Sequence, residues 1–110
     1  MSKIIEISDN DFESSVINSS LQHLVLLKFW GSWCQPCKRM EPVFSSLLES
    51  YGDKIKIFSL NIENNTIITN KFNIRSIPAT LIFKEKNLIA QHSGFLPESK
   101  LIPIINKYIV

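Results

Sequence analysis

Both cysteines of this 110-residue chain stand in one short stretch, Trp33-Cys34-Gln35-Pro36-Cys37-Lys38. Two thiols separated by two residues can close a small disulfide ring or supply two thiolate ligands to a metal. The chain has no other cysteine for either purpose. Which chemistry occurs therefore depends on the structure that surrounds Cys34 and Cys37.

The segments on either side of the two thiols predict a strand followed by a helix. Residues 24–30 form an almost unbroken apolar run, which is typical of a strand buried on both faces of a sheet. After the thiols, apolar residues recur at helical spacing up to Tyr51, and Gly52 stands where a helix would end. The two thiols are therefore expected at a strand-to-helix turn.

The expected position of Cys34 is at or just before the N-terminus of that helix. Free backbone N–H groups and the helix dipole favour a negative charge there. A thiol in such a place can have its pKa lowered from about 8.5 to between roughly 3.5 and 7.5, and the thiolate is the species that attacks disulfides. Cys34 is therefore the predicted nucleophile.

The rest of the chain alternates between strand and helix patterns. The predicted strands are residues 3–7, 24–30, 54–61, 79–84 and 88–92, and the predicted helices begin near Ser8, Cys34, Asn64 and Pro97. Pro42 and Pro103 interrupt two of these helices: a bend is expected at Pro42, and an irregular or later start in the last helix. The order βαβαβαββα predicts an α/β fold, with a central mixed sheet flanked by helices on both faces, as one domain over residues 1–110.

Composition and charge narrow the classes of function. Lys and Arg exceed Asp and Glu by only two, and no basic run is interleaved with aromatic residues, so nothing favours nucleic acid or membrane partners. No apolar segment approaches the roughly 20 residues that span a bilayer, and the first residues do not resemble a signal peptide. The sequence is interpreted as cytoplasmic, where an isolated pair of nearby cysteines is more often catalytic or metal-binding than structural.

Metal binding is the less favoured use of the two thiols. A zinc site needs four ligands, and His23 and His92 are distant in the sequence with no second pair of cysteines. An iron–sulfur cluster shared between two chains remains an open alternative, because such clusters normally need four thiolates. Neither a metal nor another cofactor is expected.

Several segments together resemble the thioredoxin family along almost the whole chain. They are Phe29–Lys38 with Trp30 and Trp33, Pro42, Asn61-Ile62-Glu63, Arg75-Ser76-Ile77-Pro78-Ala79, Phe83-Lys84 and Gly94, in the family's order and nearly its spacing. The resemblance implies the thioredoxin fold and a cis bond between Ile77 and Pro78, packed beside the thiols. It also implies a shallow groove for client proteins. The implied groove residues are Trp33, Gln35, Pro36, Ser76, Ile77, Pro78, Ser93, Gly94 and Phe95.

The resemblance also implies a reaction and its partners. The Cys34 thiolate would attack a client disulfide, and Cys37, expected to be the more buried thiol, would resolve the mixed disulfide. Disulfide-containing client proteins and an NADPH-dependent thioredoxin reductase are the implied partners of a general protein disulfide reductase, with roles in electron transport and cell redox homeostasis. A monomer is expected. The alternative is a thioredoxin-like binding module in which redox cycling is incidental.

Three positions depart from the family pattern. Gln35 replaces a usual glycine, Lys28 occupies the place of a buried aspartate, and Ser59 replaces the lysine near that aspartate. Lys28 also interrupts the most apolar strand of the chain, and burial of an ammonium group lowers its pKa. Our hypothesis is that Lys28 favours the Cys37 thiolate and accepts its proton, which would make the protein a weaker reductant than its relatives. The alternative is that Lys28 reaches out to solvent at a strand edge.

Overall fold

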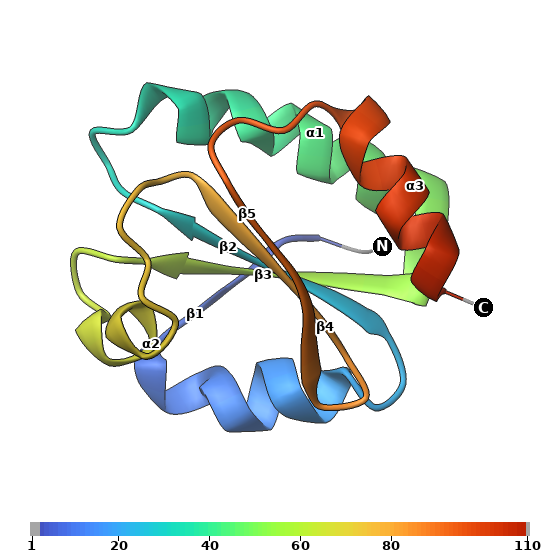
Figure 1. The fold of residues 1–110 in the computed structure, drawn as a ribbon, viewed down its shortest axis with the longest axis horizontal. Coiled ribbons are helices and arrows are strands. Elements are labelled where there is room, and N and C mark those ends of the chain that lie inside the picture. The colour runs from blue at the N-terminus through green and yellow to red at the C-terminus, as the bar shows by residue number, and fades with distance from the viewer. Residues whose placement is uncertain (1–2, 110) are drawn as a thin grey trace.

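The computed structural model describes residues 3–109, which form a five-stranded sheet with helices on both faces (Figure 1). The strands are β1 Ile5–Ile7, β2 Leu24–Trp30, β3 Ile55–Asn61, β4 Ala79–Lys84 and β5 Asn87–Ser93. The α-helices are α1 Gln35–Tyr51, α2 Thr66–Lys71 and α3 Glu98–Tyr108. The predicted α/β class is confirmed.

The strands are arranged in the order β1-β3-β2-β4-β5, with β2 in the middle. β3 runs parallel to both β1 and β2, whereas β4 is antiparallel to β2 and to β5. The predicted mixed sheet and terminal hairpin are therefore confirmed. β2 lies at the centre because its residues other than Lys28 are apolar on both sides, and all of them except Trp30 are buried.

Each face of the sheet carries its own apolar core. In Figure 1, α1 and α3 cover one face, and α2 with the helical segment of residues 9–17 covers the other. The core under α1 and α3 includes Leu26, Phe44 and Ile82. The opposite core includes Phe12 and Phe83, whose rings contact one another and the ring of Phe72. Neighbouring residues of β2 thus contribute to different cores.

The first predicted helix is not a regular α-helix. Asp9–Asp11 forms a 3-10 turn and Phe12–Ile17 a π-helix. The predicted capping role of Ser8 is confirmed, because its backbone N–H and its hydroxyl both donate to the Asp11 carboxylate, at 3.0 and 2.9 Å. These hydrogen bonds hold the pKa of Asp11 below its usual value. The inward positions of Phe12 and Val16 were predicted correctly although the helix type was not.

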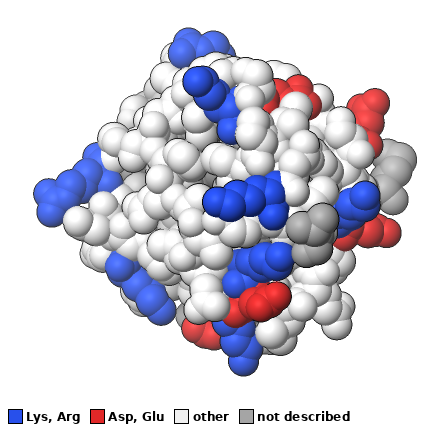
Figure 2. Space-filling view, turned by 45° about the vertical axis from the view of Figure 1, so that its right-hand side comes forward, with Lys and Arg blue, Asp and Glu red and all other residues white. Residues whose placement is uncertain are grey.

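Both interrupted helices continue through their prolines. α1 runs past Pro42, and α3 starts at Glu98 and includes Pro103, so the proline does not delay the start of α3. Apolar contacts compensate for the missing backbone hydrogen bonds, since Leu101 and Ile105 are completely buried on either side of Pro103. Charged side chains are distributed around these elements, and on the face in Figure 2 the basic residues are spread out rather than gathered in one patch.

Candidate active site

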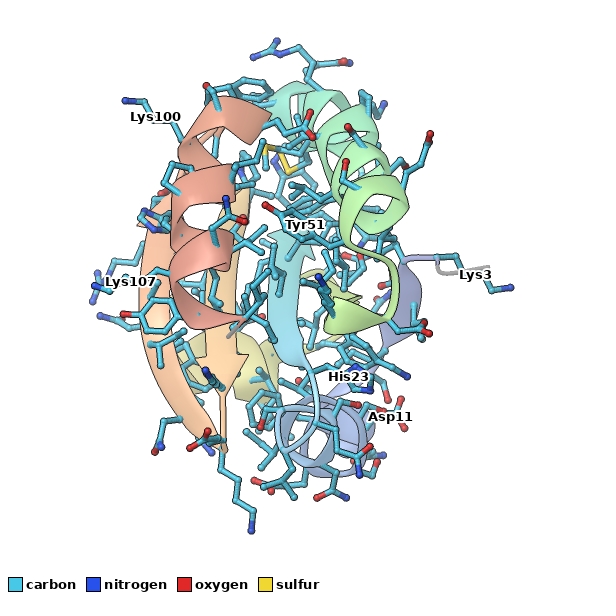
Figure 3. All side chains as sticks on the ribbon, turned by 90° about the vertical axis from the view of Figure 1, so that its right-hand side faces the viewer. Lys3, Asp11, His23, Tyr51, Lys100 and Lys107 are labelled. Carbon is cyan, nitrogen blue, oxygen red and sulfur yellow. A yellow bond between two sulfur atoms is a disulfide. The ribbon has the colours of Figure 1, made fainter. Side chains whose placement is uncertain are left out.

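Cys34 and Cys37 lie at the strand-to-helix turn that the sequence predicts. Cys34 is the N-cap of α1 and has an extended backbone, and Cys37 belongs to the first turn. The two sulfurs form a disulfide with the Cα atoms 5.3 Å apart, seen in yellow in Figure 3 at the opposite end of the sheet from the labelled His23 and Asp11. The Cys37 backbone N–H donates to Cys34 Sγ at 3.1 Å. Pro36 fits this turn because the N–H groups of a first helical turn have no partner within the helix.

The two cysteines are equally buried in the disulfide form. Each is 5% exposed, so the prediction that Cys37 is more buried than Cys34 is wrong for this form. The physical reason is that Cys34 Sγ is bonded to Cys37 Sγ and accepts the Cys37 backbone N–H, so both sulfurs lie against the first turn of α1. Client access to the sulfurs therefore depends on the surface immediately around them.

Trp33 and Ile77 approach each other across Gly31. The Trp33 side chain is 61% exposed, as predicted for a residue on the client surface. A Cβ atom added to Gly31 would lie 2.8 Å from Cη2 of Trp33 and 3.0 Å from Cδ1 of Ile77. Gly31 therefore allows the indole ring and the loop before β4 to pack closely, which brings two of the predicted groove residues together.

The loop before β4 contains the predicted cis peptide bond between Ile77 and Pro78. The Pro78 carbonyl accepts a hydrogen bond of 2.7 Å from the Gly94 backbone N–H, so the segment after β5 lies beside this loop. Gly94 has a φ of 89°, which a residue with a side chain rarely adopts. Next to it, the exposed Phe95 ring lies 5.6 Å from Cζ of Arg39 in α1.

The remaining predicted groove residues differ in exposure. Gln35, Ser76 and Ser93 are exposed, whereas Pro78 is buried. On the β2 side, Ser32 is fixed by Glu63, whose carboxylate oxygens accept from the Ser32 N–H at 2.8 Å and from its hydroxyl at 3.1 Å. These two hydrogen bonds hold the pKa of Glu63 below its usual value. Glu63 thereby anchors the turn that precedes the cysteines.

Lys28 is buried under α1 in the middle of the sheet. It is 3% exposed, and its Nζ atom lies 2.5 Å from Oε1 of Glu41 and 5.6 Å from the centre of the Phe44 ring. On the neighbouring strands its partners in register are Ser59 and Thr80, both buried. The side chain therefore does not extend to a strand edge but forms an ion pair with a carboxylate of α1.

A small cavity joins this ion pair to Cys37. Its volume is about 100 Å3, and its lining residues are Lys28, Trp30, Gly31, Cys37, Lys38 and Glu41. The indole Nε1 of Trp30 donates to both carboxylate oxygens of Glu6, each at 3.2 Å. The region beneath Cys37 thus contains both a cation and a carboxylate.

Known proteins resemble this chain over its full length. A sequence model of the thioredoxin family matches residues 3–107. The chain belongs to the thioredoxin family. Thioredoxin of Haemophilus influenzae is 39% identical over 109 residues, 99% of this chain and 100% of that protein. Thioredoxin of Pyropia yezoensis is 37% identical over 106 residues, which cover 96% of this chain and 97% of that protein.

Membership of the thioredoxin family and the adjacent cysteines define the chemistry. The chain is a thiol–disulfide oxidoreductase with protein disulfide reductase activity, and disulfide-containing proteins are its class of client. Within residues 3–109, no three His, Cys, Asp or Glu side chains are grouped as a metal site would require. The helices in this same part of the chain are too short or too polar to cross a membrane.

Glu41 is the member of the site that sequence reasoning missed. Its side chain is 53% exposed, which is ordinary for a helical glutamate, and nothing in its immediate sequence marks it. The available signal was its spacing, because Glu41 follows Cys37 by four residues and therefore lies one helical turn away on the same side of α1. That spacing places Glu41 near Cys37, but its pairing with Lys28 depends on how α1 is rotated over β2.

Proposed function

We propose that the chain is a general protein disulfide reductase, recycled by an NADPH-dependent thioredoxin reductase. The observation that carries the proposal is the position of Cys34, at the N-terminus of α1 with its sulfur accepting the Cys37 N–H. Both features favour a thiolate at Cys34 in the reduced protein. A site of action in the cytoplasm, a monomeric state and a role in electron transport belong to the same proposal.

The reaction has two steps and conserves electrons. The Cys34 thiolate attacks a client disulfide, so that a Cys34–client bond forms and one client sulfur leaves as a thiolate that takes up a proton. Cys37 loses its proton and attacks Cys34 Sγ, which releases the second client sulfur. The client gains two electrons, and Cys34 and Cys37 become the disulfide seen here. The reductase then transfers two electrons from NADPH to restore both thiols.

The groove around the cysteines is the proposed client site. Trp33 offers an exposed apolar surface on one side, and Gln35 and Pro36 lie at the rim beside Cys34. Across the cysteines, the loop with Ser76, Ile77 and Pro78 lies next to Gly94, which leaves an extended strip of backbone and apolar side chains. This arrangement suits an extended client segment with no fixed sequence.

An insulin-reduction assay with NADPH and a thioredoxin reductase tests the proposal. We expect NADPH to be consumed with the wild type and no turnover with Cys34→Ser. The Cys37→Ser variant should instead accumulate a mixed disulfide with insulin, detectable by mass spectrometry. A binding module with incidental redox chemistry would bind clients equally well in all three proteins and would show no turnover in any of them.

A further inference from the structure

The ion pair and cavity beneath Cys37 raise the question of where the Cys37 proton goes. During the second step of the proposed reaction, on which this inference rests, the Cys37 thiol must lose a proton before its sulfur can attack. Cys37 is 5% exposed, so bulk water has little access to that sulfur. A nearby group that accepts the proton would remove this obstacle.

The cavity beneath Cys37 contains such a group. Cys37 and the Glu41 carboxylate line the same space of about 100 Å3, and their positions on α1 are one helical turn apart. A water molecule occupies about 30 Å3 in the liquid, so a space of this size has room for water between sulfur and carboxylate. The Lys28 ammonium and the Glu41 carboxylate on its wall give that water polar partners. A proton can pass along such a chain without any movement of the backbone.

Glu41 also connects the cavity to solvent. Its side chain is 53% exposed, whereas that of its partner Lys28 is 4% exposed. A proton taken up on the cavity side can therefore leave from the solvent side of the same carboxylate. Lys28 holds the carboxylate in this place through the 2.5 Å contact between Nζ and Oε1, and the ammonium group is itself fixed by its position on the central strand.

We propose that Glu41 is the proton acceptor for Cys37 in the resolving step, and that Lys28 positions it. The Cys37 proton passes through water to the Glu41 carboxylate as the Cys37 sulfur bonds to Cys34 Sγ. The bond between Cys34 and the client sulfur breaks, and the client leaves as a thiolate. When the reductase later reduces the disulfide, Glu41 returns a proton to Cys37. The sequence-based hypothesis gave the acceptor role to Lys28; here the carboxylate takes it.

Other charged groups near the cavity fit this role less well. Lys38 lines the cavity but is a cation, and Glu6 lies on the far side of Trp30, where both of its oxygens accept the indole N–H. The neighbouring strands contribute only the hydroxyls of Ser59 and Thr80 in register with Lys28, and His92 lies beyond Thr80 on β5. Glu41 is the carboxylate that lines the cavity with Cys37.

Stopped-flow reaction of the reduced protein with DTNB separates the two steps. Attack by Cys34 releases one thionitrobenzoate in a phase that depends on DTNB concentration, and attack by Cys37 releases a second in a phase that does not. With Glu41→Gln we expect the second phase to slow at least about tenfold at pH 7, because general-base contributions are typically about 10²- to 10⁴-fold. The first phase should stay within about twofold, because Cys34 attacks without help from the carboxylate.

Two further variants exclude explanations based on charge or folding. Glu49→Gln makes the same change at an exposed site on α1 and should leave both phases unchanged. Lys28→Met/Glu41→Gln removes the whole pair, so the net charge beneath Cys37 stays as in the wild type and no buried ammonium is left unpaired. Its second phase should be as slow as that of Glu41→Gln.

The possible outcomes separate this inference from the proposed function. Glu41→Gln leaves an ammonium group beneath Cys37 that favours the thiolate, so a purely electrostatic role for Glu41 would make the second phase faster. A second phase at or above the wild-type rate in Glu41→Gln or in the double variant overturns the inference. A wild-type protein that releases only one thionitrobenzoate would instead contradict the proposed reductase mechanism.

Discussion

The two faces of the sheet are built from the same five strands but contain different chemistry. On the face under α2, the apolar core is centred on three aromatic rings, Phe12, Phe72 and Phe83, with centroids 5.6 to 5.8 Å apart. On the face under α1, a row of polar residues crosses the sheet next to the apolar row of Leu26, Ile57 and Ile82. The first face supplies stability, whereas the second places charged groups beneath the cysteines.

The polar row follows the strand register from one edge to the other. Its members are Glu6, Ser59, Lys28, Thr80 and His92, one from each strand. Burial of polar groups is costly unless they find partners, and the Thr80 hydroxyl has no hydrogen-bond partner within residues 3–109. The polar row therefore does not improve stability, and its member Lys28 lines the cavity with Cys37. Both points indicate that the row serves a function.

The largest expected effect is on the aromatic face. Phe83→Ala removes a ring that is 2% exposed and contacts two others, and should lower the free energy of unfolding by about 3–5 kcal/mol. Urea denaturation measures this loss. The redox potential of the folded variant should equal that of the wild type, because the ring lies on the opposite face from Lys28. A shifted potential would show that the two faces are coupled.

The second prediction concerns the stability that is lost when the ion pair between Lys28 and Glu41 is broken. Glu41→Gln leaves the Lys28 ammonium buried without its carboxylate and should lower the free energy of unfolding by about 1–3 kcal/mol. The Lys28→Met/Glu41→Gln variant should be more stable than Glu41→Gln, because it removes the buried charge as well. Urea denaturation of both variants checks this order. The reverse order would mean that the ammonium is adequately solvated without Glu41.

The third prediction concerns the redox potential. Lys28→Asp replaces the buried cation by a second carboxylate near Glu41, which disfavours a thiolate at Cys37. The reduced form is then less stable, so the potential should become more negative, by about 30 mV for each tenfold change in the equilibrium constant. Equilibration with glutathione measures it. A potential that is unchanged or higher would contradict the hypothesis that Lys28 favours the thiolate.

Much of this arrangement was predictable from the sequence, because β2 and α1 have strong and different periodicities. The position of Cys34 at the N-cap followed from these two segments, and Lys28 stood out because it interrupts an apolar strand. The partnership with Glu41 was not predicted, because it depends on how α1 is rotated relative to β2, which the sequence of neither element specifies. The π-helix at Phe12–Ile17 was missed for a similar reason, since its apolar spacing also fits an α-helix.

The smallest expected effect is at the turn that joins β2 to the cysteines. The pKa of Glu63 is lowered first by the backbone N–H of Ser32 and then by its hydroxyl, so the ionised carboxylate stabilises the folded state. This stabilisation is present above the ordinary glutamate pKa of 4.5 and is lost as the pH falls through the lower pKa of Glu63 in the folded state. The wild type should therefore have a slightly higher urea midpoint than Glu63→Gln at pH 7, and the difference should disappear in acid.

Glu49→Gln, altered at an exposed site on α1, should show no such pH-dependent difference. If the difference between the wild type and Glu63→Gln persists at low pH, the turn is held by the shape of the side chain rather than by its charge.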